Sequence, residues 1–257
     1  STNKKRKQFM SSLVKYKFLM MKNRLEINID ENTNFKDVIN YIKLNELDMV
    51  LLVSSDEMKT IYRELSYNKD RNDSPMGMYL KYYDRNYTFL CDVLGNKFKQ
   101  DIEYLNNYYE YLNIIFICMD NIKSCIESLR INHSSILNDL SLTVRDDSLL
   151  ICVDELFNKV FAHECGHLIF SYDDSQIFDR VFEERRANYF VSFIFDGKYD
   201  YFNLYLTSLQ SWMYKDPLVK PDIEYIYNLL VKKVSSNVSL NELFDNYNKE
   251  VDKLYEK

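Results

Sequence analysis

The strongest constraint on the fold is one short segment that contains two of the chain's three histidines. This segment, FNKVFAHECGHLIFSY at residues 157–172, includes HECGH, an instance of the HExxH pattern. Helical residues follow one another at about 100°, so His163 and His167 share one face about a turn apart, and both imidazoles can reach one zinc ion. Glu164 flanks that position and can take a proton from a metal-bound water. The pattern therefore predicts a metal-binding helix.

Zinc needs a third protein ligand and an open position for water. The remaining histidine, His133, lies in the polar segment INHSS and is interpreted as a surface residue. No HExxHxxGxxH extension follows HECGH, so we expect a carboxylate. The candidates lie in EERRAN, residues 183–188. Glu184 and Asn188 share a helical face, so Glu184 can bind zinc while Asn188 hydrogen-bonds a ligating histidine, and Glu183 is expected to face solvent.

Two simpler interpretations stand beside the metal site. The histidines can be satisfied in a core with Glu164 exposed, and EERRAN can be a charged helix face stabilised by ion pairs. Cys165 lies between the two histidines but far round the helix from both, so it is expected to face away from the metal as a packing residue.

Both motifs together resemble a known family. HECGHLIF followed by EERRANYF is similar to the ImmA/IrrE-type metallopeptidase pattern, in which HExGH and a few apolar residues precede E-x-x-A-N-x-F. The resemblance covers residues 140–195 and includes the Gly166 position. It implies a zincin fold and a cytosolic regulatory protease, with these roles: His163, His167 and Glu184 as zinc ligands and Glu164 as catalytic base. Cys165 stands where the family has an aliphatic residue, and no helix-turn-helix segment is evident.

The composition favours a compact, helix-rich protein without a membrane span. Of 257 residues, 46% are hydrophobic, and there are only 4 glycines and 3 prolines. The net charge of -6 gives no general attraction for nucleic acid, and the basic run KKRK is interpreted as a solvated chain start. Five cysteines without a CxxC pair indicate reduced thiols and a cytoplasmic location, although a signal removed before Ser1 is compatible with the sequence.

Periodicity predicts an α+β fold, mostly helical, with a small β-sheet beside the HExxH helix, and the family resemblance implies that its core is a zincin-like metallopeptidase core. RLEINID and DMVLLVSS are predicted strands; NFKDVINYIKL and DEMKTIYRELSY are predicted helices, the latter capped by Ser55. MYLKYYDRNYTFLCDV fits either a hairpin or a buried helix, and residues 101–131 predict one long amphipathic helix. LSLTV and SLLICV predict a hairpin that ends at Asp154, a candidate cap for the HExxH helix.

A breaker-rich run, NKDRNDSPMG, marks the best domain border. We therefore expect three parts: residues 1–75 as a small α/β region of unknown role, 76–200 as the zincin-like domain, and 201–257 as a helical segment packed on it. The helix that contains EERRAN is expected to stop at Gly197.

The predicted activity is zinc-dependent hydrolysis of peptide bonds in a protein substrate, most simply a regulatory protein. An extended substrate is expected to pair with an edge of the LSLTV/SLLICV sheet. Three alternatives are a catalytically silent zinc-binding regulator, an effector or toxin-type HExxH protease acting on host proteins, and a DNA-binding regulator that only KKRK supports. The expected partner is a protein or peptide substrate, and the sequence gives no strong sign of nucleic-acid binding and no membrane span.

Overall fold

The computed structural model describes six segments and five single residues: 10–28, 44–65, 74–83, 87–107, 109–127, 153–170, and 184, 187, 190, 191 and 194. The elements in chain order are α1 Ser12–Asn28, η1 Leu44–Glu46, β1 Met49–Leu52, α3 Ser55–Leu65, β2 Gly77–Tyr83, α4 Tyr87–Leu94, η3 Gly95–Phe98, α5 Lys99–Asn106, β3 Tyr111–Ile117 and α7 Val153–Phe170. A helix also covers residues 119–127, and the five single residues are helical. This part of the chain is therefore α+β and mostly helical.

The strands form a mixed sheet in the order β1-β3-β2. The central strand, β3, runs parallel to β1 and antiparallel to β2, and Ile115 lies between Val50 and Tyr79. Its residues from Leu112 to Ile117 are all buried, as expected for a strand covered on both faces. The sheet thus joins strands from both sides of residue 75, where the sequence predicted a domain border.

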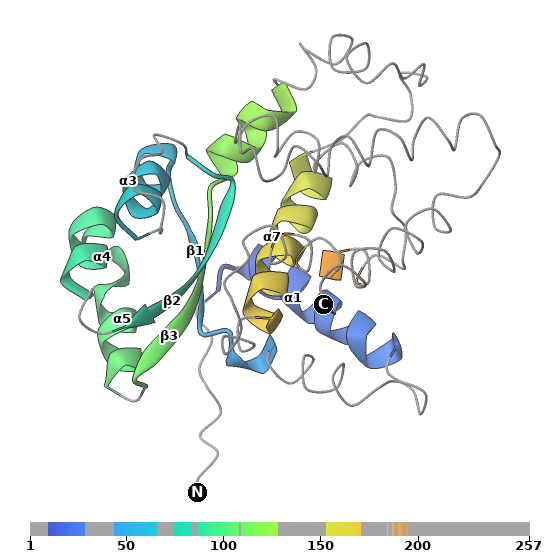
Figure 1. The fold of residues 1–257 in the computed structure, drawn as a ribbon, viewed down its shortest axis with the longest axis horizontal. Helices are drawn as coiled ribbons and strands as arrows, with labels where there is room; N and C mark the ends of the chain where they lie inside the picture. Colours follow the sequence, from blue (N-terminus) through green and yellow to red (C-terminus); the bar gives the residue numbers. More distant parts are fainter. Residues whose placement is uncertain are drawn as a thin grey trace, which may run out of the picture.

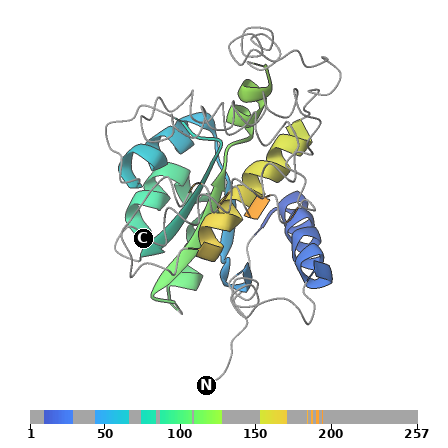
Figure 2. The same cartoon turned by 45° about the vertical axis from the view of Figure 1, so that its right-hand side comes forward.

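Helices cover both faces of the sheet, with α3, α4 and α5 on one face and α1 and α7 on the other (Figures 1 and 2). Side chains alternate between the two cores because a strand has a period of two residues. The core on the α7 side contains Val50, Ile115 and Ile117, and the opposite core contains Met49, Ile114 and Phe116. Phe18 of α1 packs edge-on against Phe161 of α7, with ring centroids 6.4 Å apart. Burying each such side chain contributes about 1.5–3 kcal/mol.

The long helix predicted for residues 101–131 is wrong. The structure has α5, then β3, then the helix over 119–127. The isoleucines at spacings of three and four belong partly to β3, where a continuous apolar run fills both faces of a central strand. Periodicity alone does not distinguish such a run from a buried helix, and here tertiary burial decided for the strand.

Other local predictions have mixed outcomes. The DMVLLVSS strand and DEMKTIYRELSY helix are confirmed by β1 and α3. RLEINID was predicted as a strand, but residues 24–28 continue α1. MYLKYYDRNYTFLCDV forms neither a hairpin nor one helix, because β2 is followed by α4. The predicted LSLTV/SLLICV hairpin, residues 34–43 of the NFKDVINYIKL helix and residues 201–257 lie outside the described residues.

Two helix starts differ from the predictions, α3 by one residue and α7 by two. Ser54, rather than Ser55, caps α3: the Glu57 N–H donates to Ser54 Oγ at 3.2 Å, and the Ser54 N–H donates to Glu57 Oε1 at 3.0 Å. This reciprocal pair is a capping box. Asp154 lies within the first turn of α7, which begins at Val153, so it does not occupy the cap position. Its negative charge there still favours the helix N-terminus.

Cys118, Cys125 and Cys165 are buried, as predicted for packing residues. Burial raises the pKa of Cys125 to about 11. Burial also raises the pKa of Cys118 and of Cys165, and the nearby Glu164 carboxylate adds to the rise at Cys165. Among the described helices, none is both long and apolar enough to cross a membrane.

A polar network ties the three strands together at one end of the sheet. Asn113 of β3 is fully buried; its backbone N–H donates to Asp48 Oδ2 at 2.8 Å, and its side-chain amide donates to the Glu46 carbonyl at 3.1 Å. The Tyr79 hydroxyl of β2 donates to Asn113 Oδ1 at 2.7 Å. One amide side chain therefore links β2 and β3 to the segment that precedes β1.

We expect Asn113→Ala to lower the free energy of unfolding by about 1–3 kcal/mol, because it leaves the Tyr79 hydroxyl and the Glu46 carbonyl without this partner. Urea denaturation measures the change. The matched control is Asn23→Ala on the exposed side of α1, expected within about 0.5 kcal/mol of wild type. Equal losses in the two variants would contradict this role for Asn113.

Thiol labelling tests the two cores. Cys91 is partly exposed, so a maleimide at pH 8 should modify it before Cys118, Cys125 and Cys165. The thiolate is the reactive form, and a pKa of about 11 leaves only about one Cys125 thiol in a thousand ionised at pH 8. Labelling of Cys125 should therefore rise as the pH approaches 11 or as the protein unfolds. Peptide mass spectrometry reads the order, and early labelling of Cys125 would show that its core is open.

Candidate metal centre

The predicted HExxH helix is confirmed by α7, which packs against β2 and β3. Asp154 and Glu155 lie in its first turn, where negative charge is favourable. The apolar residues of α7 fix its orientation because they are buried in the core shared with α1; these include Leu156, Phe157, Val160, Phe161, Leu168 and Ile169. With α7 held in this orientation, His163 and His167 lie together on the side toward Glu184.

The donor atoms of three side chains converge at this site. His163 Nε2 and His167 Nε2 are 3.1 Å apart, with the two rings nearly perpendicular at 87°. Glu184 places Oε2 at 3.0 Å from His163 Nε2 and Oε1 at 3.4 Å from His167 Nε2. The expected approach of Glu184 to the two histidines is therefore present.

These distances fit a zinc ion. Ligand atoms about 2.0–2.1 Å from a tetrahedral zinc lie about 3.3 Å from one another, close to the three spacings found here. An imidazole nitrogen without a proton and a carboxylate both present lone pairs, so three such acceptors repel one another unless a proton or a cation lies among them. Two imidazoles and one carboxylate are a donor set that zinc accepts, with the fourth position left for water.

The environment of Glu184 favours its charged form. Although 42% of its side-chain surface is accessible, the carboxylate end packs against the imidazoles, and this burial opposes ionisation. The charges of His167 and His163, with their hydrogen bonds, outweigh burial and hold the Glu184 pKa well below its usual range. Glu184 is thus an anion on the accessible side of the site, where water can reach it.

Glu164 has the opposite environment. Its side chain is almost fully buried, and it lies with His163 and His167 in one group whose donor atoms are all within 4.8 Å of one another. Burial raises the pKa of Glu164, and the Glu184 charge adds to the rise, whereas the two imidazoles and a hydrogen bond from the Tyr79 backbone oppose it. Two carboxylates whose pKa values shift in opposite directions are typical of active sites in which one carboxylate stays charged and the other transfers protons. The interpretation that places Glu164 in solvent is therefore wrong.

The segment that contains Glu184 reaches α7 because both helices have small residues where they meet. A Cβ atom on Gly166 would lie 2.8 Å from Ala187 Cα and 3.2 Å from Phe190 Cβ. Ala187 is itself fully buried, and Phe190, Val191 and Ile194 join the core on the α7 side. Their spacing is that of one helical face. Periodicity did not predict the contact between Gly166 and Ala187; its sequence signal is a small residue in each of the two motifs, HECGH and EERRAN.

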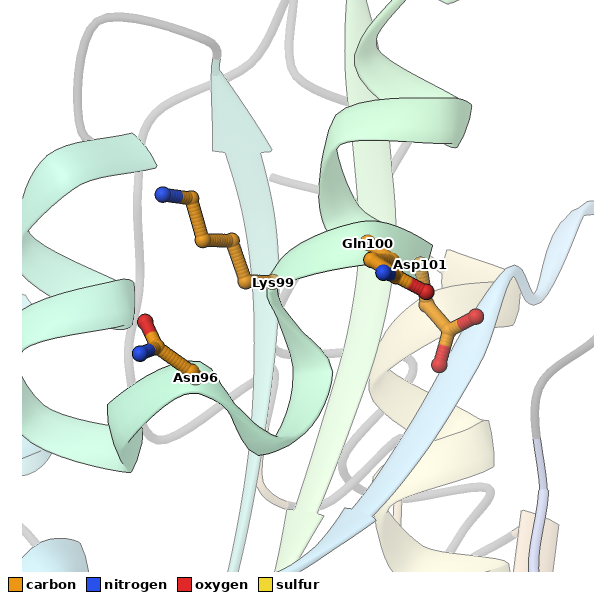
Figure 3. Close-up of a pocket in the computed structure, with 4 residues that line it drawn as sticks. All are labelled: Asn96, Lys99, Gln100 and Asp101. Carbon is orange, nitrogen blue, oxygen red and sulfur yellow. The ribbon is translucent and has the colours of Figure 1, made fainter.

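Three residues singled out in the sequence lie outside the described part of the chain, and one pocket lies away from this cluster. Asn188, Glu183 and His133 lie outside the described residues. Figure 3 shows a pocket of about 330 Å³ at η3 and α5, lined by Asn96, Lys99, Gln100 and Asp101. This pocket lies on the side of the sheet away from α7, and its lining contains no histidine or cysteine. It is a surface hollow and has no part in the metal centre.

Gly166→Ala tests the contact that brings Glu184 to the histidines. The added methyl group must push Ala187 away, so we expect zinc affinity to fall by about tenfold or more, in the same direction as in Glu184→Ala. Competition with a chromophoric chelator measures the affinity. Cys165→Ala is the control, because Cys165 is buried in the adjacent core without facing the metal. Unchanged zinc affinity in Gly166→Ala would show that the contact does not set the position of Glu184.

Comparisons with protein-family models, curated proteins and solved structures found no match to this chain. What the site can do therefore follows from its own side chains. Two imidazoles and an ionised carboxylate can hold a divalent cation, and a second, buried carboxylate beside them can accept and return a proton. This combination suits metal-assisted hydrolysis.

Proposed function

We propose that the chain is a zinc-dependent endopeptidase with a zincin-like core, in which His163, His167 and Glu184 bind zinc and Glu164 is the general base. The observation that carries the proposal is the convergence of the His163, His167 and Glu184 side chains, whose nearest donor atoms lie 3.0 to 3.4 Å apart, with Glu164 buried beside them. The similarity of HECGHLIF and EERRANYF to the ImmA/IrrE-type pattern supports the same assignment.

Each residue has a definite part in this mechanism. Zinc bound here supplies a Lewis acid, which polarises the scissile carbonyl and lowers the pKa of a water molecule. Glu164 accepts a proton from that water on its carboxylate and later donates it to the leaving nitrogen. Its raised pKa suits both steps, because a proton taken near neutral pH must also be held until the amine leaves. The lowered pKa of Glu184 suits a zinc ligand, which must be ionised to bind the metal.

An edge strand beside Glu164 supports an extended peptide as the substrate. β2 is the last strand of the described sheet on this side. The Met76 carbonyl accepts a hydrogen bond from the Cys118 N–H at 2.9 Å. In an antiparallel pair, every second residue from Met76 onward therefore directs its N–H and C=O toward β3. The residues between them direct their N–H and C=O away from the sheet. Apart from the Tyr79 N–H, which bonds to the Glu164 carboxylate, the outward groups of such an edge can pair with an extended chain. The edge predicted from LSLTV and SLLICV lies outside the described residues.

The competing functions have less support. A silent zinc-binding regulator does not require a buried carboxylate next to the ligands. Burying Glu164 costs free energy, so its burial here favours a function in which the carboxylate takes part in the chemistry. An effector or toxin-type protease would use the same chemistry, and no described feature favours it. The proposal of a cytoplasmic protease that acts on a regulatory protein rests on the family resemblance.

The test is a peptide-library cleavage assay on protein loaded with about one zinc per chain. We expect Glu164→Gln to keep its zinc and to lower kcat by about 10²–10⁴, because the amide cannot accept the proton. Glu155→Gln, the same change on an exposed turn of α7, should keep wild-type activity. Chelation should abolish cleavage and added zinc should restore it. Zinc-loaded wild-type protein that cleaves no peptide of the library would contradict the proposal.

A further inference from the structure

Gly77, the first residue of β2, lies directly against Glu164 and has no side chain there. A Cβ atom on Gly77 would lie 2.7 Å from Val160 Cγ1, 3.0 Å from Glu164 Cγ and 3.2 Å from Glu164 Oε1. Contacts below 3.0 Å do not occur between real side chains without a shift of one partner. The hydrogen atom of Gly77 therefore leaves a space that the Val160 and Glu164 side chains fill.

The same strand also binds the end of that side chain. The backbone N–H of Tyr79 donates a hydrogen bond to the Glu164 carboxylate. Tyr79 is held in turn by its hydroxyl, which donates to the buried Asn113 of β3 at 2.7 Å. The donor is thus part of a sheet with little freedom to move, and it directs the carboxylate of Glu164 from the side opposite to its helix.

We propose that Gly77 and the Tyr79 backbone amide are positioning residues for Glu164: Gly77 leaves room for the side chain and the amide fixes its carboxylate beside the metal site. This inference rests on the proposed function, because it assigns a purpose to the position of the general base. A base must lie within hydrogen-bond reach of the proton that it takes, so a small displacement of the carboxylate is enough to slow the reaction.

The chain around Gly77 offers little room for compensation. Val160 is β-branched and lies one helical turn before Glu164, so its rotamer on α7 is strongly restricted. Val160 is also buried in the core on this side of the sheet. A methyl group at position 77 must therefore move α7 as a whole or turn the Glu164 side chain out of its place.

The experiment compares Gly77→Ala with three further variants. The double variant Gly77→Ala/Val160→Ala removes the contact of the new methyl group with Val160 and keeps its contact with Glu164. A loss of activity in this variant therefore reports a displaced Glu164 side chain and not a shift of α7. Val160→Ala alone controls for the lost methyl groups. Gly95→Ala is the matched glycine control: Gly95 has φ 67°, so alanine there is strained, but nothing lies within 4 Å of the added atom.

We expect Gly77→Ala/Val160→Ala to bind zinc like wild type and to lose about 100-fold in kcat, with KM nearly unchanged. Val160→Ala and Gly95→Ala should keep most of kcat. The second readout is hydrogen exchange of the Tyr79 amide by NMR, which requires no substrate. The Tyr79 amide should exchange faster in Glu164→Ala and in Gly77→Ala than in wild type, and at the wild-type rate in Gly95→Ala.

Each result decides the inference. Wild-type kcat in the double variant, or Tyr79 exchange that is unchanged in Glu164→Ala, would overturn it. Glu164→Ala leaves Gly77 intact, so this measurement remains decisive even if Gly77→Ala does not fold. If the wild-type protein binds zinc but cleaves no peptide, the proposed function fails, while faster Tyr79 exchange in the two variants still supports the positioning of Glu164 by β2.

Discussion

The close approach of α7 to two neighbouring segments is the constraint on which the site depends. On one side, Gly77 lets β2 lie directly against Val160 and Glu164; on the other, Gly166 lets the segment with Ala187 lie directly against the helix. A side chain of ordinary size at either glycine would separate the elements by more than the few tenths of an ångström that a metal site tolerates. The contact at Gly166 brings Glu184, the candidate third ligand, to the histidines, and the contact at Gly77 holds Glu164, the candidate base.

The electrostatics follow from this packing. Glu164 points into the protein between α7 and β2, so burial dominates and raises its pKa. Glu184 approaches from the accessible side, where two imidazoles outweigh the burial of its carboxylate and lower its pKa. Two glutamates thus acquire different chemical characters from their positions, one suited to binding a cation and the other to carrying a proton. The sheet supports this division through the Asn113 network, which fixes Tyr79 and hence the hydrogen bond to Glu164.

Local patterns with a strong physical signal predicted well, whereas patterns shared by two structures did not. The HExxH helix and the proximity of Glu184 followed from helical geometry and from the number of ligands that zinc requires. The long helix over 101–131 failed because apolar residues of β3 repeat at spacings that also suit a helix, and only burial on both faces distinguishes the two. The strand predicted for RLEINID failed for a similar reason. Its apolar residues alternate as in a strand, but residues 24–28 form the end of α1.

The sequence by itself determined which side chains are candidates for the metal centre, because HExxH fixes two imidazoles and a carboxylate on one short helix and few other residues can complete a zinc site. It also determined the mostly helical α+β character of the chain. Only the tertiary structure decided where these groups lie relative to the rest. The roles of Gly77, Tyr79 and Ala187 arise from contacts between segments far apart in the sequence, and a glycine's missing side chain has meaning only when the atoms that would meet it are known.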